Sequence, residues 1–313
     1  MTPWKPYILF YSTESTQKFL EKIYKKHGAE AALLSYRNSC PFTYYLMHAE
    51  SFYRQAEAAP FSIRPILLFY GLSQLIKACL LTEDPHYPET TSVLAHGVTA
   101  RKKKKQDYSF LKDEVRVQKN GLFHHTARTL FHLREMDRDR YTMEMLLRRI
   151  PEMESCFTFL RNGKAPIPLK QDLHAIIVPP EAATAYHITD RRLAEIIEHH
   201  TGLSAEEKNG EFRIDTQDTL TPFASSLFSY HCGKKEYSLP AEKQQLFILP
   251  ELLTHYLVSY NLSMISRYET EWWYDLIQNR ASSDYIYISS FMEITGEKIP
   301  RLVWDYLSGR ALG

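Results

Sequence analysis

The segment RPILLFYGLSQLIKACLLT, from Arg64 to Thr82, decides the fold class of this chain. Pro65 occupies the first turn, where a helix tolerates proline. Apolar residues almost encircle a helix drawn through the segment and leave Tyr70, Gln74 and Lys77 on one stripe. Its most apolar window, about 17 residues long, is too short and too polar to span a bilayer. We therefore expect a core helix at the centre of a helical bundle, and no membrane association.

Helical sequence patterns flank this segment on both sides. Caps, proline positions and apolar spacing predict further helices at 13–27, 41–59, 142–160, 250–269, 286–294 and 300–307. Pro41 and Pro300 are each expected at the start of a helix. We predict a mostly α (α+β) protein, in which an N-terminal helical region, 1–164, packs against C-terminal helices in 250–313.

Two parts of the chain have sequence patterns typical of β-strands. In DEVRVQKNGLFHHTA, valines alternate with charged residues, and Asn120-Gly121 suits a type I′ turn. This pattern predicts a β-hairpin near 113–127. Residues 165–249 contain several short strand-like runs and one well-capped helix, which predicts a small central α+β segment.

Charge is distributed unevenly, although the net charge of the 313-residue chain is only +1. Residues 1–150 hold 23 Lys and Arg against 15 Asp and Glu, and residues 151–313 hold 15 against 22. Such polarity can steer an anionic partner, let two parts of the molecule attract each other, or simply form a solvated surface.

The four cysteines never form CxxC and no signal-peptide pattern is present, so we expect reduced thiols in a cytoplasmic protein.

The common catalytic signatures are absent. The chain has no P-loop, GxGxxG, HExxH, GxSxG or EF-hand pattern. Neighbouring histidines on a strand point to opposite faces, so His124-His125 favours ordinary side chains over a metal site. We expect no metal and no cofactor.

Arg192 and His199 have the Arg-x6-His spacing of HEPN-type ribonucleases. This spacing also arises by chance among this many arginines and histidines.

The basic run RKKKK at 101–105 suggests nucleic acid at first sight. Nucleic-acid binding usually combines such charge with aromatic platforms or a recognition helix. Tyr108 and Phe110 are the nearest aromatic residues, and acidic residues follow closely. A solvated loop is the better interpretation of this run, and nucleic acid is the less favoured partner.

Polar side chains embedded in otherwise apolar helices are more informative. Cations in apolar surroundings need carboxylates, carbonyls or an anionic ligand as partners. Internal salt bridges are one interpretation, and a pocket for a phosphate- or nucleotide-sized anion between helices is the other. The candidate ligand-binding residues are Arg37, Arg64, Tyr70, Lys77, His96 and Arg267, and we assign no catalytic residue. Gly97 lets the backbone turn tightly next to His96.

Three separated stretches carry a family resemblance. They are WKPYILFYSTESTQKFL (4–20), RPILLFYGLSQLIKACLL (64–81) followed by AHG (95–97), and YNLSMISRYETEWW (260–273). Together they resemble the YaaC-like proteins of Bacillus and its relatives over almost the whole chain. That family has no established reaction, so the resemblance implies no catalytic residues. It implies a cytoplasmic bacterial protein whose gene neighbour encodes IMP dehydrogenase, and hence a link to purine-nucleotide metabolism.

These observations favour a non-catalytic binding or regulatory protein over an enzyme. We expect it to recognise a purine nucleotide, or a purine-metabolism enzyme such as IMP dehydrogenase. The alternative is an RNA-binding protein or a HEPN-like ribonuclease. A purely structural subunit is a third interpretation.

Overall fold

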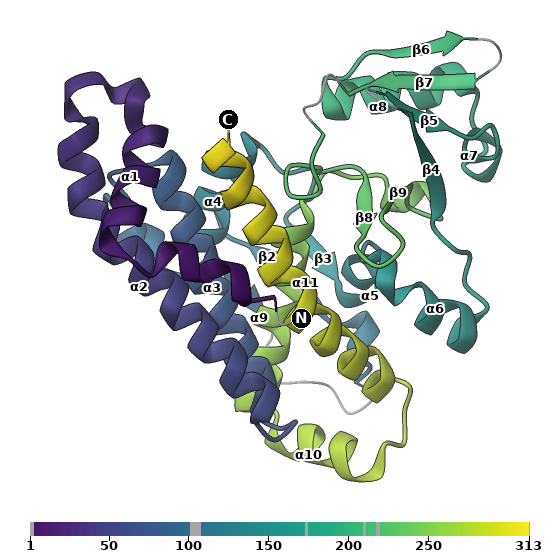
Figure 1. Cartoon of the computed structure of the whole chain (residues 1–313). Coiled ribbons are helices and arrows are strands. Elements are labelled where there is room, and N and C mark those ends of the chain that lie inside the picture. The colour runs from purple at the N-terminus through teal and green to yellow at the C-terminus, as the bar shows by residue number, and fades with distance from the viewer. Residues whose placement is uncertain (1–2, 101–107, 173–174, 209–210, 217–219, 313) are drawn as a thin grey trace.

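The computed structural model describes residues 3–100, 108–172, 175–208, 211–216 and 220–312, and shows a helical body with a smaller α+β segment beside it (Figure 1). The α-helices are α1 (Thr13–Tyr24), α2 (Ala31–Ala58), α3 (Arg64–Glu83), α4 (Leu122–Phe131), α5 (Met143–Leu147), α6 (Glu154–Arg161), α7 (Glu181–Ala185), α8 (Asp190–Thr201), α9 (Glu251–Tyr268), α10 (Thr270–Asn279) and α11 (Asp284–Leu312). The strands are β1 (Val98–Ala100), β2 (Glu114–Val117), β3 (Arg140–Thr142), β4 (Ile167–Asp172), β5 (Ala175–Val178), β6 (Ala205–Lys208), β7 (Glu211–Asp215), β8 (Ser229–His231) and β9 (Glu236–Leu239). The chain is therefore mostly α-helical with antiparallel sheets, as the sequence predicts.

Helix α3 lies at the centre of the body. It packs against α2, α9 and α11, and α2 and α3 run side by side (Figure 1). Gly71 permits this close packing, because a Cβ at that position would lie 2.6 Å from the Tyr53 ring of α2. The helix is long and apolar enough to cross a membrane, yet 72% of its most apolar window is buried inside the fold. These contacts make α3 a core helix.

Two helices continue through a proline that the sequence analysis placed at a helix start. Pro41 lies inside α2 and Pro300 inside α11, so the two expected final helices are one. Proline has no N–H, so the carbonyls of Arg37 and Gly296, four residues earlier, lose their usual helical donor. Ile299 before the proline and Val303 after it are both fully buried, so the apolar face of α11 continues across the proline, and this packing compensates for the lost hydrogen bond.

The structure corrects the predicted hairpin at 113–127. Strand β2 is present, but its partners are β1 and β3 in a three-stranded antiparallel sheet. Gly121, with a φ of +113°, precedes α4 where a second hairpin arm was expected. The buried residues here have helical spacing: Leu122, Phe123 and Thr126. Packing against the helical body therefore favours a helix over a strand. The Asn-Gly signal marks a helix start.

The α+β segment has a hydrophobic core of its own. Its six-stranded antiparallel sheet has the order β6-β7-β5-β4-β9-β8. Leu193 and Ile197 of α8 belong to the same buried cluster as Ile176 of β5 and Ile214 of β7. A separate and larger core fills the helical body.

Arg149, which follows α5, is buried against the chain that connects the segment to the body. Only 3% of Arg149 is exposed. Its guanidinium donates to four carbonyl oxygens, those of Ser226, Gln245, Leu249 and Leu227, at 2.8, 3.0, 3.2 and 3.4 Å. It lies 4.7 Å from the Phe247 ring centre. Burial lowers the pKa of Arg149 to about 10, so the group stays charged at neutral pH and needs these acceptors.

Lys298 of α11 is a second buried cation. Its ammonium pairs with Glu251 of α9 and, at 2.6 Å, with Glu152 of the short helix η5 (Pro151–Met153). It also donates to the Tyr230 carbonyl of β8 at 2.6 Å. Burial alone would lower the pKa of Lys298, but the two carboxylates raise it above its ordinary value. Lys298 thus ties two helices of the body to the edge strand of the segment.

Replacing Arg149 with methionine should lower the free energy of unfolding by about 3 kcal/mol, because several buried carbonyls lose their donor. Urea denaturation followed by circular dichroism measures this change. Arg128→Met, at an exposed position of α4, is the matched control and should change stability by no more than about 0.5 kcal/mol. Equal destabilisation by the two substitutions would contradict the role given to Arg149.

Candidate functional site

His96 lies just before β1, and hydrogen bonds from two helices fix its backbone. Its carbonyl accepts from the Tyr256 hydroxyl of α9 at 3.0 Å. It also accepts from the Phe123 N–H in the first turn of α4, at 3.2 Å. The first turn of a helix has N–H groups free for such bonds, so α4 holds this loop without a side chain. The imidazole is thereby placed against α3 and α9.

Two glycine backbones touch directly behind His96. Gly97 has a φ of +74°, which is the tight turn expected from the sequence. A Cβ built on Gly121 would lie 2.5 Å from the Cα and the N of Gly97, so no side chain fits there. A Cβ on Gly97 would lie 3.0 Å from the Asn120 carbonyl oxygen. The position of His96 therefore depends on both glycines.

Aromatic rings surround the His96 imidazole. The ring centres of Phe69, Tyr260 and Tyr70 lie 4.9, 5.8 and 6.1 Å from that of His96. Phe69 is fully buried, whereas His96 and Tyr70 are partly exposed. Helix α3 supplies the two rings from consecutive positions, and α9 supplies the third.

Two cations border these rings. Lys77 follows Tyr70 by two turns of α3, and Arg267 follows Tyr260 by two turns of α9, so each cation is on the same helix face as one of these rings. Burial lowers the pKa of His96, and the positive charges of Arg267 and Lys77 lower it further. Burial also lowers the pKa of Lys77. We call His96, Phe69, Tyr70, Lys77, Tyr260 and Arg267 the His96 cluster.

Neither cation of the His96 cluster forms an ion pair with a carboxylate in the described part of the chain. Lys77 lies 5.7 Å from the ring centre of Tyr45 on α2. Arg267 donates to the Ser263 carbonyl one turn earlier, at 2.8 Å. These contacts leave the positive charge of both side chains uncompensated, which is the condition for attracting an anion.

The aromatic surface continues onto α2. Phe52 stacks on Tyr70 with ring centres 5.9 Å apart, and His48 stacks on Phe52 at 4.5 Å. His48 and Phe52 are one helical turn apart, so they share a face of α2. The His96 cluster is thus one end of a longer aromatic strip along α2 and α3.

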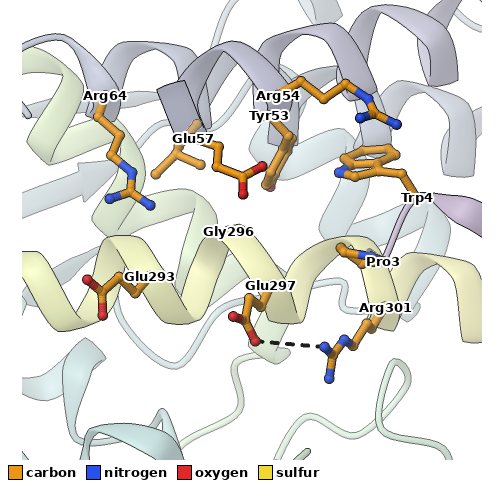
Figure 2. Close-up of a pocket in the computed structure, with 11 residues that line it drawn as sticks. Pro3, Trp4, Tyr53, Arg54, Glu57, Arg64, Glu293, Gly296, Glu297 and Arg301 are labelled. Atoms are coloured by element: carbon orange, nitrogen blue, oxygen red, sulfur yellow. Dashed lines mark ion pairs between the residues drawn. The ribbon is translucent and has the colours of Figure 1, made fainter. Parts of the chain in front are cut away.

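Four of the six candidate residues from the sequence meet in this cluster: Tyr70, Lys77, His96 and Arg267. Arg37 does not, because it is exposed on α2 and donates to the Pro85 carbonyl at 2.8 Å. Arg64 does not either. It lines a cavity of about 390 Å³ between α2, α3 and α11 (Figure 2).

Sequence reasoning missed Phe69 and Tyr260. Phe69 looked like one more apolar core residue of α3. Tyr260 precedes Arg267 by seven residues, which puts both on one face of α9, and this spacing was the available signal.

The remaining sequence candidates lie elsewhere. Arg192 forms an ion pair with Glu195 at 2.8 Å on an exposed face of α8, and His199 is also exposed there. The lysine run at 101–105 lies outside the described residues. Among the residues that the structure describes, no three His, Cys, Asp or Glu side chains gather to hold a metal ion.

Comparisons with known proteins assign a family but no activity. The model of the YaaC-like protein family matches residues 8–307. No curated protein and no solved structure matches the chain. Because the family model spans nearly the whole sequence, the chain belongs to the YaaC-like protein family.

Proposed function

We propose that this protein is a non-catalytic binding protein that recognises a phosphorylated nucleotide at the His96 cluster. The observation that carries the proposal is the pair of cations, Lys77 and Arg267, beside aromatic rings and without carboxylate partners in the described structure. Cations pair with phosphate, and aromatic faces stack with a base. A nucleotide combines both groups in one molecule.

The composition of the cluster favours binding over catalysis. Its six side chains include no carboxylate and no thiol to act beside His96 as a base or nucleophile. The lowered pKa of His96 means that the imidazole is neutral at pH 7, so one ring nitrogen donates and the other accepts. A neutral imidazole in this position suits hydrogen bonding to a base or a ribose.

Calorimetric titration with AMP, GMP and IMP tests the proposal; the family resemblance directs attention to purines. We expect at least one of them to bind the wild-type protein. Lys77→Gln and Arg267→Gln should each weaken binding roughly 10- to 100-fold, because each removes a charge-assisted contact with phosphate.

Arg128→Gln removes a positive charge from exposed α4 and serves as the control, with unchanged affinity. The nucleotide site is refuted if none of the three nucleotides binds, or if the two cluster variants bind as tightly as the wild type.

RNA is the competing ligand, and salt dependence separates it from a nucleotide. Each phosphate contact with a single strand contributes about −0.7 to the slope of log K against log salt. A mononucleotide on Lys77 and Arg267 should therefore give a slope no steeper than about −1.5. A much steeper slope with RNA oligonucleotides, together with RNA cleavage that His199→Ala abolishes, would favour the ribonuclease alternative.

A protein partner is a separate proposal, for which the family resemblance names IMP dehydrogenase. Co-purification of the two proteins at defined nucleotide concentrations tests it. A nucleotide-dependent complex that Arg267→Gln weakens is the expected result. Absence of a complex at every nucleotide concentration would remove this partner.

A further inference from the structure

The cavity that contains Arg64 differs in character from the His96 cluster. It lies between α2 and α3 on one side and α11 on the other, and the chain at Trp4 closes one end (Figure 2). Its volume of about 390 Å³ is within the usual range for small-molecule sites. None of its lining residues belongs to the His96 cluster.

The inner wall of the cavity is apolar and aromatic. Trp4, Tyr53 and Leu68 are 6%, 4% and 2% exposed, and the rings of Trp4 and Tyr53 have centres 5.3 Å apart. The Tyr53 hydroxyl is buried with no hydrogen-bond partner in the described structure. A buried hydroxyl without a protein partner is costly, so this group is available to bond with a molecule in the cavity.

Charged side chains of both signs line the same cavity. Arg301 already pairs with Glu297 at 3.7 Å. Arg64, Glu57 and Glu293 form no ion pair with any described residue, and the Arg64 Nε is buried without an acceptor. In Figure 2 the Arg64 guanidinium is directed from α3 toward α11, on the side where Glu293 lies. A ligand here meets one unpaired cation and two unpaired carboxylates.

Helix α11 contributes a backbone acceptor at Gly296. Residue 300 is proline, so the Gly296 carbonyl lacks the N–H that would normally bond to it from four residues later. Glycine inside a helix is unfavourable, yet neither packing nor backbone conformation requires it here, because a Cβ would meet nothing within 4 Å. The missing side chain leaves open space beside this part of the α11 backbone.

We propose that this cavity binds a free amino acid with an apolar or aromatic side chain. Arg64 takes the carboxylate, and Glu57, Glu293 and the Gly296 carbonyl take the ammonium. The side chain packs on Trp4 and Leu68. A simple anion would leave both glutamates unpaired and meet their repulsion, and a simple cation would leave Arg64 unpaired. A zwitterion satisfies both signs at once.

Calorimetric titration of the full chain with each of the twenty L-amino acids tests the proposal. At least one amino acid with an apolar or aromatic side chain should bind. Its methyl ester lacks the carboxylate and its N-acetyl derivative lacks the ammonium, so each should bind at least about tenfold more weakly, one lost charged contact being worth that factor. The proposal is overturned if no amino acid binds, or if the ester and the N-acetyl derivative bind as tightly as the amino acid itself.

Two glycines of α11 provide matched variants. Gly296→Leu places a side chain in the cavity and should abolish binding. Gly309→Leu makes the same change on the same helix, also where a Cβ meets nothing within 4 Å, and should leave binding unchanged. Both substitutions raise helix propensity, so loss of binding in Gly296→Leu does not come from unfolding. Binding by Gly296→Leu at wild-type affinity contradicts the assignment.

The site does not rest on the proposed nucleotide function. Lys77→Gln should bind the amino acid as the wild type does, and Arg64→Gln should bind it at least about tenfold more weakly. If Arg64→Gln retains full affinity, the carboxylate is not held here and the proposal fails. The two sets of variants therefore separate failure of one site from failure of the other.

Discussion

The arrangement of the molecule depends on one buried charge, the ammonium of Lys298. A lysine removed from water must be neutralised, and its partners come from three places: Glu251 of α9, Glu152 of η5 and the carbonyl of Tyr230 in β8. Hydrophobic contacts alone permit two cores to slide, because they have no direction. An ammonium bonded to three fixed acceptors prevents the two cores from sliding past each other. The charge thus fixes the α+β segment to the body at α9 and α11, and each of these helices forms one wall of a candidate site.

Helix α3 separates the two candidate sites. At about 100° per residue, Arg64 and Leu68 fall on one side of the helix, and Tyr70 and Lys77 fall on nearly the opposite side. Because most of α3 is apolar and buried in the core, only these few polar or half-exposed positions of the helix can contribute to a binding site. Aromatic rings occur at both sites, but the charges differ. The charged members of the His96 cluster are both cations, whereas Arg64 shares its cavity with carboxylates. The two surfaces therefore suit different ligands.

The sequence predicts the parts of this fold that are decided locally. Apolar periodicity was enough for α3 and for the mostly helical class. The polar stripe of α3, the arginine at the end of α9 and the His-Gly pair together pointed to four residues of the His96 cluster. Local signals failed where tertiary packing decides. Asn120-Gly121 suits a hairpin turn and the start of α4 equally well, and Pro300 reads as a helix start although α11 passes through it. The cavity at Arg64 could not be predicted at all, because it exists only where α11 meets α2, more than two hundred residues away in sequence.

The contact between Gly97 and Gly121 has a genetic consequence. Every single-base change in the first two positions of a glycine codon either stops translation or introduces a residue with a Cβ. At Gly121 that atom would lie 2.5 Å from the neighbouring backbone, and at Gly97 it would occupy a left-handed conformation. No missense change at Gly121 is therefore conservative. Each one displaces the loop that carries His96, so only third-position changes in these two codons leave the contact intact.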